Sequence, residues 1–375
     1  MSESRRDEVD VLRGVALFGI CVVNMPFLAG IDPLVPPAAA PDRAVAFLVA
    51  MLFQGKFFVL FSFLFGWGFA VQQASAARQE RGSGARYGRR LAALLAIGVA
   101  HALFVFTGDI LVLYALLGAL LWLLRDASSA RLFGASGLLL GVAFVALGLL
   151  GVVLDAAVTS PGDGNGYLGT FADAFRQRLR EWPLSFGFVL AFNGPVALAA
   201  FCAGLGAARL GFFEPGAGSY AWLRSRWPGL LATGLATNAA YASSMVGLAG
   251  DGVPALVGFA ALAIGGPCLA SVYLVVVVEL VRRACLPRAL ASAGRLSLSA
   301  YVAQGVLAGL LFNGYGLGLY GRVGDAACLG IAGAIYALVH SLADFWWRAA
   351  GQGPLERLLR ATAGASVSRP RGARR

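Results

Sequence analysis

Charged residues are scarce in this 375-residue chain: they make up 13% of it, whereas hydrophobic residues make up 59%. Ordinary soluble domains carry about 25% charged residues, so the composition excludes a typical soluble protein. The mean hydropathy of +0.75 instead predicts an all-α, polytopic integral membrane helical bundle embedded in a lipid bilayer.

Missing motifs exclude further classes. The five cysteines occur singly, without Cys-x-x-Cys or Cys/His ligand spacing, so we predict no metal site and no disulfide framework. Walker A, Gly-x-Ser-x-Gly, His-Glu-x-x-His and dinucleotide-binding signatures do not occur either. Only two histidines, His101 and His340, and one lysine, Lys56, are present. Candidate general bases are therefore few.

The basic residues are grouped between hydrophobic segments. A net charge of +11 distributed in this way indicates membrane topology rather than nucleic-acid binding, and placing both termini in the cytoplasm puts most arginines inside. About ten transmembrane helices are predicted, each near the ~20 residues that cross a bilayer. They are 10–30, 55–75, 90–107, 109–125, 132–155, 185–209, 221–247, 252–281, 296–314 and 324–347.

The chain divides into an N-terminal half, connecting spans, a C-terminal transmembrane region and a basic tail that we expect to be disordered. The connecting spans include the main extracytoplasmic loop, 156–184. In the N-terminal half, the segment 44–53 is too short to span the membrane and is predicted as an interfacial or re-entrant half-helix. The four regions are 1–125, 126–210, 211–360 and 361–375.

The shortest predicted hairpin contains His101 and, eight residues later, Asp109. Polar groups at membrane depth usually face a cavity, a partner or a pathway. One interpretation is a satisfied core histidine, with Asp109 capping the helix that follows. We favour the other, in which the carboxylate orients the imidazole as a general base.

Polar residues also punctuate the first two spans. Asp10 and Arg13 share a helix face, with Asn24 further along it, which indicates either an inner-surface anchor or an arginine at the mouth of a polar track. Lys56 either snorkels to the outer interface or binds a substrate carboxylate or developing anion. We expect Lys56 to be the nearest basic neighbour of the His101 hairpin.

Two later helices carry polar stripes. Ser297, Tyr301 and Gln304 stand at i, i+4 and i+7, a spacing that fits interhelical hydrogen bonding and a channel lining equally well. His340 and Asp344 are one turn apart, and we interpret them as a polar stripe satisfied within the bundle near its inner end.

Taken together, these motifs resemble the YeiB-like membrane proteins, and the resemblance covers nearly the whole chain. The motifs that carry it are Asp10-x-Leu12-Arg13-Gly14 with Asn24, Gly55-Lys56-Phe57, His101 with Gly108-Asp109-Ile110-Leu111 and Tyr114, Gly294-Arg295 with Tyr301 and Gln304, and Gly353-Pro354-Leu355-Glu356 with Arg360.

The first half of this family is similar to transmembrane acyltransferases of the heparan-glucosaminide N-acetyltransferase type. The resemblance implies a multi-pass protein of the bacterial inner (plasma) membrane that moves an acyl group from cytoplasmic acyl-CoA, its co-substrate, to a small-molecule or glycan acceptor. Related O-acyltransferases place a functional histidine in the first span. Here Asn24 stands in that neighbourhood, so His101 would take the role.

The predicted site follows from this resemblance and from the charge layout. His101 and Asp109 are the catalytic candidates, and Lys56, Asn24, Tyr114, Ser297, Tyr301 and Gln304 are the substrate-binding candidates. Arg13, Arg89, Arg90 and Arg295 would meet the CoA phosphates. The alternative function is a transporter or exporter that uses the same buried ionisable groups. Homodimerisation is compatible with the sequence.

Overall fold

The computed structural model describes residues 3–32, 35–77, 83–156, 164–248, 253–286 and 289–362. Within these residues the protein is all-α, as predicted, and contains helices and turns but no strand. The helices are α1 (Glu3–Leu28), α2 (Ala40–Leu52), α3 (Lys56–Ala77), α4 (Ser83–Phe104), α5 (Leu111–Leu123), α6 (Ser129–Ala156), α7 (Asn165–Leu168), α8 (Phe171–Arg209), α9 (Gly218–Ser225), α10 (Trp227–Met245), α11 (Val253–Arg282), α12 (Leu290–Arg295), α13 (Ser297–Phe312), α14 (Asp325–Ala350) and α15 (Pro354–Thr362).

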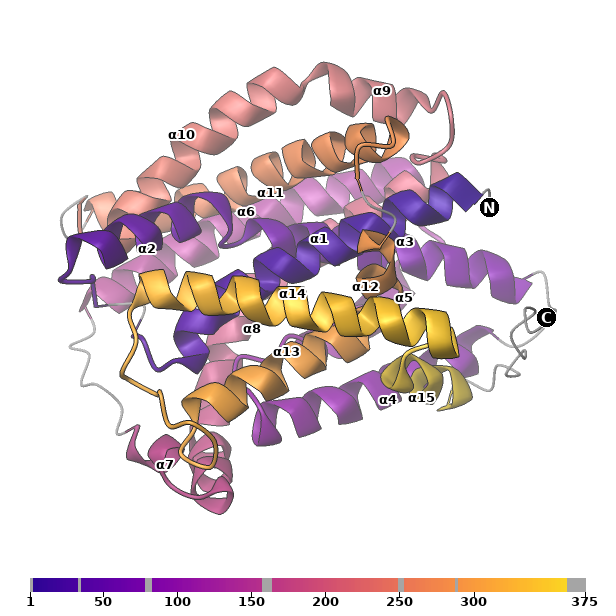
Figure 1. The fold of residues 1–375 in the computed structure, drawn as a ribbon. Helices are drawn as coiled ribbons and strands as arrows, with labels where there is room; N and C mark the ends of the chain where they lie inside the picture. The colour runs from indigo at the N-terminus through magenta and orange to yellow at the C-terminus, as the bar shows by residue number, and fades with distance from the viewer. Residues whose placement is uncertain are drawn as a thin grey trace.

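The long helices form one bundle whose members run roughly along a common direction (Figure 1). The start of α1 and the end of α14 lie at the same end: Arg295 of α12 bonds Asp10 of α1, and Ser292 bonds Asp344 of α14. We call this the terminal end. The opposite end, which holds α7 and the turn between α4 and α5, is called the hairpin end.

Six stretches of the described chain are long and apolar enough to cross a membrane: Asp7–Leu28, Ala40–Ala76, Ser129–Val153, Phe171–Arg209, Leu256–Arg282 and Asp325–Ala350. Helices α5 and α13 are also apolar but shorter. These helices support the assignment as a membrane protein. Every predicted span coincides with a helix, while the count of about ten and the orientation of the termini stay predictions.

The boundaries differ from the sequence-based ones at two places. Residues 171–184, predicted as part of an extracytoplasmic loop, are helical, because α8 begins at Phe171 with a capping box between Thr170 and Asp173. The predicted span 221–247 is divided near Arg226 into α9 and α10. Residues 157–163 of the loop and 363–375 of the tail lie outside the described residues.

The predicted half-helix 44–53 corresponds to α2, which is followed by a break before α3. Gly55 stands in this break with a φ of 83°, a conformation that favours glycine because it carries no Cβ. Ala40–Ala76 is therefore an interrupted helix within the bundle rather than a continuous one.

Small residues and aromatic rings pack the bundle. A Cβ on Gly66 of α3 would come within 2.0 Å of the Phe201 carbonyl oxygen, and one on Gly204 of α8 within 2.0 Å of the Phe63 carbonyl oxygen, so α3 and α8 approach backbone to backbone. Phe18 of α1 packs against the Tyr336 ring, with centroids 5.1 Å apart.

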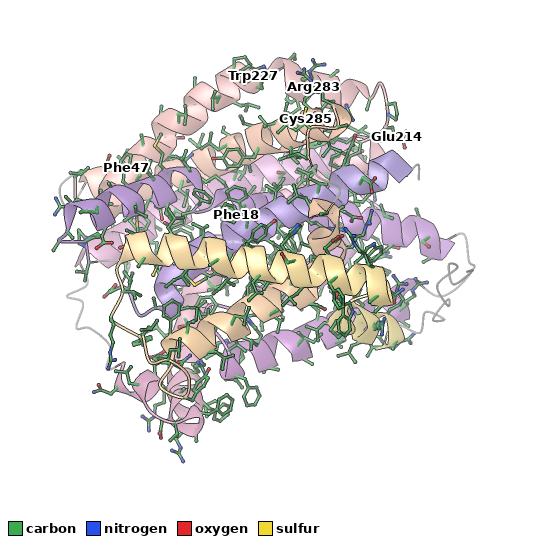
Figure 2. The ribbon with its side chains drawn as sticks, viewed as in Figure 1. Phe18, Phe47, Glu214, Trp227, Arg283 and Cys285 are labelled. Carbon is green, nitrogen blue, oxygen red and sulfur yellow. The ribbon has the colours of Figure 1, made fainter. Side chains whose placement is uncertain are left out.

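A few labelled side chains mark the two ends of the bundle. Figure 2 places Glu214 and Arg283 at the terminal end near α9, and Phe47 of α2 toward the hairpin end. Exposed Trp222 and Trp227 flank the junction of α9 and α10, a position typical of aromatic residues at a membrane interface.

Candidate functional site

His101 and Asp109 form a buried hydrogen-bonded pair. His101 near the end of α4 is 3% exposed and Asp109 in the following turn is 1% exposed. His101 Nδ1 and Asp109 Oδ1 are 2.9 Å apart, and Asp109 Oδ2 accepts from the Val112 N–H at 3.0 Å. Asp109 thus caps α5, as one interpretation expected, and contacts the imidazole at the same time, while a general-base role for His101 stays a prediction.

The contact with Asp109 is made by Nδ1 of the imidazole. An ionised carboxylate only accepts hydrogen bonds, so with such a partner Nδ1 is the donor. In the described structure, His101 Nε2 is buried without a hydrogen-bond partner. It borders a space of about 10 Å³ that Asn24 and Gln304 also line, a volume that suits a single water molecule.

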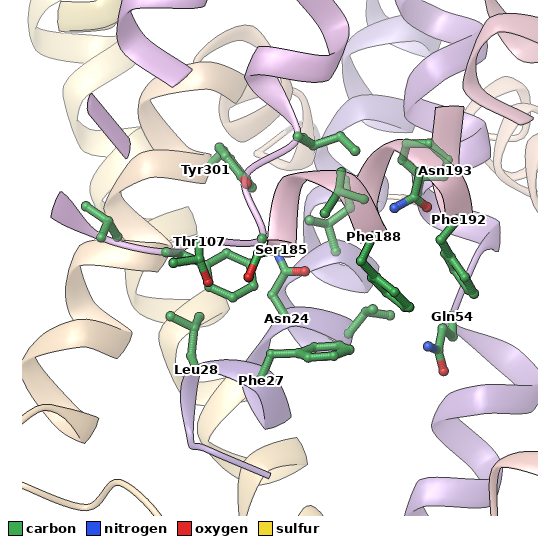
Figure 3. Close-up of a pocket in the computed structure, with 18 of the residues that line it drawn as sticks. Asn24, Phe27, Leu28, Gln54, Thr107, Ser185, Phe188, Phe192, Asn193 and Tyr301 are labelled. Atoms are coloured by element: carbon green, nitrogen blue, oxygen red, sulfur yellow. The ribbon is translucent and has the colours of Figure 1, made fainter. Parts of the chain in front are cut away.

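A large cavity opens toward the hairpin end, and we call it the aromatic cavity. Its volume is about 630 Å³, and its walls come from α1, the α2–α3 break, the α4–α5 turn, α8 and Tyr301 of α13. Figure 3 shows Phe27, Phe188 and Phe192 around it, with the amides of Asn24 and Asn193 interspersed. Apolar walls with a few convergent polar groups are typical of small-molecule sites.

The rim of this cavity at the hairpin end carries two phenols. Tyr167 of α7 and Tyr320 stack with ring centroids 4.9 Å apart, and both line the cavity. Burial raises the pKa of Tyr320 to about 12 and raises the pKa of Tyr167 as well. Both phenols therefore remain protonated donors at neutral pH.

A second cavity of about 750 Å³ opens at the terminal end, and we call it the arginine cavity. Helices α1, α3, α4 and α13 form its walls, and Glu356, Leu359 and Arg360 of α15 line it as well. The arginines that border it are Arg13, Arg86, Arg90, Arg295 and Arg360. The cavity thus gathers positive charge, which suits a polyanionic ligand.

The two cavities meet inside the bundle. Ile20, Ile110, Tyr114 and Tyr301 line both of them. The Tyr301 ring lies 4.9 Å from the His101 ring, centroid to centroid, and its hydroxyl donates to Asp109 Oδ1 at 3.5 Å. The partition between the cavities therefore stands directly beside the His101–Asp109 pair.

The predicted phosphate-binding arginines are not equivalent. Arg295 bonds Asp7 at 2.6 Å and Asp10 at 3.1 Å. Arg13 bonds Asp10 at 3.4 Å. Among the described residues Arg90 has no ion pair. Arg89 does not line the cavity, and its Nε donates to the Thr362 carbonyl.

The difference between Arg89 and Arg90 follows from helix geometry. Successive residues point about 100° apart, whereas residues four apart share a helix face. Arg86 is four residues before Arg90 and does line the cavity. This spacing could have identified Arg86 from the sequence.

Helix α15 is fixed to the start of α13. Glu356 Oε1 accepts from the N–H groups of Leu298 and Ser299 at 2.8 and 3.1 Å, and its Oε2 accepts from the Ser299 hydroxyl at 2.5 Å. These N–H groups begin a helix and lack partners within it. A residue from outside α13 thus caps that helix and holds α15 at the arginine cavity.

Three comparisons of sequence relate the chain to known proteins. Residues 207–365 match the model described as "Protein of unknown function (DUF418)". The chain is 28% identical over 401 residues to the uncharacterized protein YxaH of Bacillus subtilis (strain 168), over 96% of this chain and 94% of that one. It is 33% identical over 160 residues to the uncharacterized protein YeiB of Escherichia coli (strain K12), over 40% of each chain. The chain is therefore similar to the YeiB-like proteins, and its residues 207–365 carry the match to the family model.

The region matched by the family model contributes only part of the site. Residues 207–365 include Tyr301, Gln304 and Glu356. His101 and Asp109 precede the matched region. The site is thus assembled from both halves of the chain.

The structure places the predicted polar face of α13 around the partition. Ser297 lines the arginine cavity, Tyr301 lines both cavities, and Gln304 borders the small space beside His101. Tyr114, predicted to bind substrate, shares a 2.6 Å hydrogen bond with the Ser62 hydroxyl. Asn24 lines the aromatic cavity and the small space.

Lys56 does not lie beside the hairpin, contrary to the prediction. Its side chain is completely buried at the α2–α3 break, where Nζ donates to the Ala50 carbonyl at 2.7 Å and lies 5.8 Å from the centre of the Tyr241 ring. It lines neither large cavity. Snorkelling to an interface is also wrong, because the break turns the amine into the bundle.

His340 lies apart from both large cavities. Its ring stacks on Tyr336 with centroids 5.8 Å apart. Its neighbour Asp344 bonds Ser292 at 2.8 Å and Arg348 at 2.7 Å. Asp344 is satisfied as expected from the sequence, whereas Nδ1 of His340 is buried without a partner within the described structure.

Sequence reasoning missed Arg178 and Glu181. Both lie in the second and third turns of α8 and line the aromatic cavity. The segment was predicted as part of an extracytoplasmic loop, and these two side chains were not singled out in it. A helical interpretation of 171–184 would have placed both residues on the face that continues to Ser185 and Phe188.

The described part of the chain contains no evident cluster of metal-ligating side chains. No group of three or more His, Cys, Asp or Glu side chains there could hold an ion.

Proposed function

We propose that this protein transfers an acyl group from cytoplasmic acyl-CoA to an acceptor that enters the aromatic cavity. The observation that carries the proposal is the meeting of two cavities beside the His101–Asp109 pair. One cavity is lined by arginines and the other by aromatic rings and amides, so each suits a different substrate. The proposal places the terminal end, with its excess of arginines, in the cytoplasm.

The arginine cavity would hold the nucleotide part of acyl-CoA. Guanidinium groups bind phosphates with directed hydrogen bonds. Arg90, which has no ion pair among the described residues, and Arg360 of α15 are the first candidates. Arg13 and Arg295 are already paired with acidic side chains, so they would mainly keep Asp10 neutralised.

His101 would act as the general base. Its Nε2 takes the proton of an acceptor hydroxyl or amine, directly or through one water in the space of about 10 Å³, while the acceptor attacks the thioester carbonyl. A carbon–oxygen or carbon–nitrogen bond forms and the carbon–sulfur bond breaks. The departing thiolate then takes the proton from the imidazolium, which restores neutral His101.

Asp109 and Asn24 would support this step in different ways. Asp109 keeps the proton on His101 Nδ1 and stabilises the imidazolium while it exists. Asn24 lines both the aromatic cavity and the space beside His101, so its amide N–H can stabilise the oxyanion. Lys56 takes no part, because its amine is buried at the α2–α3 break and donates to the Ala50 carbonyl there.

Labelled acetyl-CoA tests the proposal. We expect the purified protein, reconstituted in lipid nanodiscs, to bind acetyl-CoA and to transfer or slowly hydrolyse its acetyl group. His101→Ala should abolish turnover without abolishing binding. His340→Ala, which changes the other histidine outside both cavities, is the matched control. Absence of acetyl-CoA binding by folded wild-type protein would refute the proposal.

A transporter is the second candidate, favoured by the interrupted helix at Gly55. Broken helices and cavities that reach a central partition from both sides are features of alternating access. Lys56 places a buried amine at this break. Proton-coupled flux of a substrate into proteoliposomes without acyl-CoA, lost in Lys56→Met, would support transport instead of acyl transfer.

A further inference from the structure

Arg178 is a buried guanidinium whose partners are neutral. The residue is 2% exposed. One nitrogen donates to the Phe104 carbonyl at 3.2 Å, another donates to Asn313 Oδ1 at 3.2 Å, and the guanidinium carbon lies 5.4 Å from the centre of the Tyr167 ring. In the described residues no carboxylate forms an ion pair with it.

The nearest candidate counter-ion along the helix is already engaged. Glu181 Oε2 accepts from the Tyr167 hydroxyl, and its Oε1 accepts from the Gln177 amide at 2.7 Å. Burying an uncompensated charge is costly, and a guanidinium has five N–H donors, more than the two used here. The position thus combines an unmatched charge with unused donors.

Arg178 lines the aromatic cavity rather than a closed core. The same wall of α8 continues through Ser185 to Phe188 and Phe192, which Figure 3 shows bordering the cavity. At 1.5 Å per residue, the distance from Arg178 to Phe192 along the helix is about 20 Å. The cavity therefore offers a cation at its rim and aromatic surface further inside.

We propose that the aromatic cavity binds an amphiphilic anion, whose carboxylate or phosphate pairs with Arg178 and whose apolar body extends along α8 toward Phe188 and Phe192. If acyl transfer is the function, on which this extension rests, the anion belongs to the acceptor. The anionic group would belong either to a lipid headgroup or to a soluble molecule.

Direct binding tests this inference without acyl-CoA. The probes are 4-phenylbutyrate and the neutral 4-phenylbutanamide, measured by calorimetry with full-length protein in an uncharged detergent. We expect wild-type protein to bind the anion roughly tenfold or more tightly than the amide, because only the anion forms an ion pair with the guanidinium. Equal affinities for the two probes would overturn the inference.

Two variants assign the effect to Arg178. Arg178→Gln should bind both probes equally. Since this change also removes contacts between α4, α8 and α13, Asn313→Asp provides a second variant: it supplies an internal carboxylate at the contact atom and should also remove the preference for the anion. Arg176→Gln removes the same charge from an exposed position of α8, and this variant should retain the preference for the anion. A preference that survives in folded Asn313→Asp would contradict the inference.

The source of the anion is distinguished by competition. Phosphatidylglycerol in nanodiscs, compared with phosphatidylcholine, should displace 4-phenylbutyrate if the natural ligand is a lipid, and should leave its binding intact if the ligand is soluble. His340→Ala should bind the probe like wild type, because His340 lines neither large cavity. If acetyl transfer fails while anion preference remains, the proposed function alone is refuted; the converse refutes only this inference.

Discussion

The carboxylate of Asp109 joins His101 to the first turn of α5: one oxygen lies 2.9 Å from the imidazole Nδ1, and the other accepts a backbone N–H of that turn. A single side chain thus fixes the ring orientation and the start of the next helix. Its two oxygens have separate tasks, which makes those tasks experimentally separable.

Replacing Asp109 with Asn should lower the rate of acyl transfer strongly and the melting temperature only slightly. The amide oxygen can still cap α5, but the amide cannot favour protonation of His101 Nδ1 as a carboxylate does. We expect the rate to fall by about 10²–10⁴-fold, measured as transfer or hydrolysis of labelled acetyl-CoA. The melting temperature reports whether the fold is kept. An undiminished rate would remove Asp109 from the mechanism.

Replacing Arg90 with Gln should raise the KM for acetyl-CoA by about tenfold, the effect of losing one charge-assisted contact with phosphate, while kcat changes little. Arg89→Gln is the matched control, because the neighbouring side chain points away from the arginine cavity. Steady-state kinetics at low and high salt measure both. The same KM for the two variants would argue against a phosphate contact at Arg90.

Replacing Tyr301 with Ala should open the partition between the two cavities, because this ring lines both of them. Water then reaches the thioester, so we expect acetyl-CoA hydrolysis to rise relative to acetyl transfer. Tyr301→Phe keeps the ring and removes only its hydroxyl contact with Asp109. A hydrolysis-to-transfer ratio equal in the Ala variant and wild type would show that the ring does not separate the cavities.

Replacing Lys56 with Met should preserve acyl transfer. The change removes a fully buried amine with one recorded hydrogen bond, to the Ala50 carbonyl, and supplies an apolar chain of similar length, which a buried site tolerates better than an unpaired charge. Lys56→Glu, which buries a carboxylate beside that carbonyl, should destabilise the protein strongly. Thermal unfolding and acetyl transfer measure the two effects. Loss of acyl transfer in a stable Lys56→Met variant would show that Lys56 contributes to the reaction.

Replacing Glu356 with Ala should release α15 from α13. The change removes three hydrogen bonds to Leu298 and Ser299, and we expect a loss of about 1–2 kcal/mol in the free energy of unfolding, as for other helix caps. Limited proteolysis near Gly351 should accelerate, and the KM for acetyl-CoA should rise. Unchanged proteolysis would mean that other contacts hold α15.

The sequence was most informative where a residue type is rare and helix geometry is local. His101 and Asp109 could be paired because the segment between them is short, and the spacing of Ser297, Tyr301 and Gln304 described one helix face before any neighbour was known. In each case the relation depends on periodicity within a few turns.

Relations between helices distant in sequence were not predictable in this way. Lys56 was expected near His101, but the break at Gly55 directs its amine toward Ala50 and Tyr241. Arg178 was overlooked because 171–184 was interpreted as a loop. Its contact with Asn313 joins residues 135 positions apart, and no local pattern encodes such a contact.

Gly66 and Gly204 set how closely two helices can approach. Each lies against a carbonyl of the other helix, the Phe201 carbonyl for Gly66 and the Phe63 carbonyl for Gly204. A methyl group at either position would overlap that carbonyl, so any larger residue would force α3 and α8 apart. The spacing of these two helices, which between them carry walls of both cavities, thus depends on two hydrogen atoms.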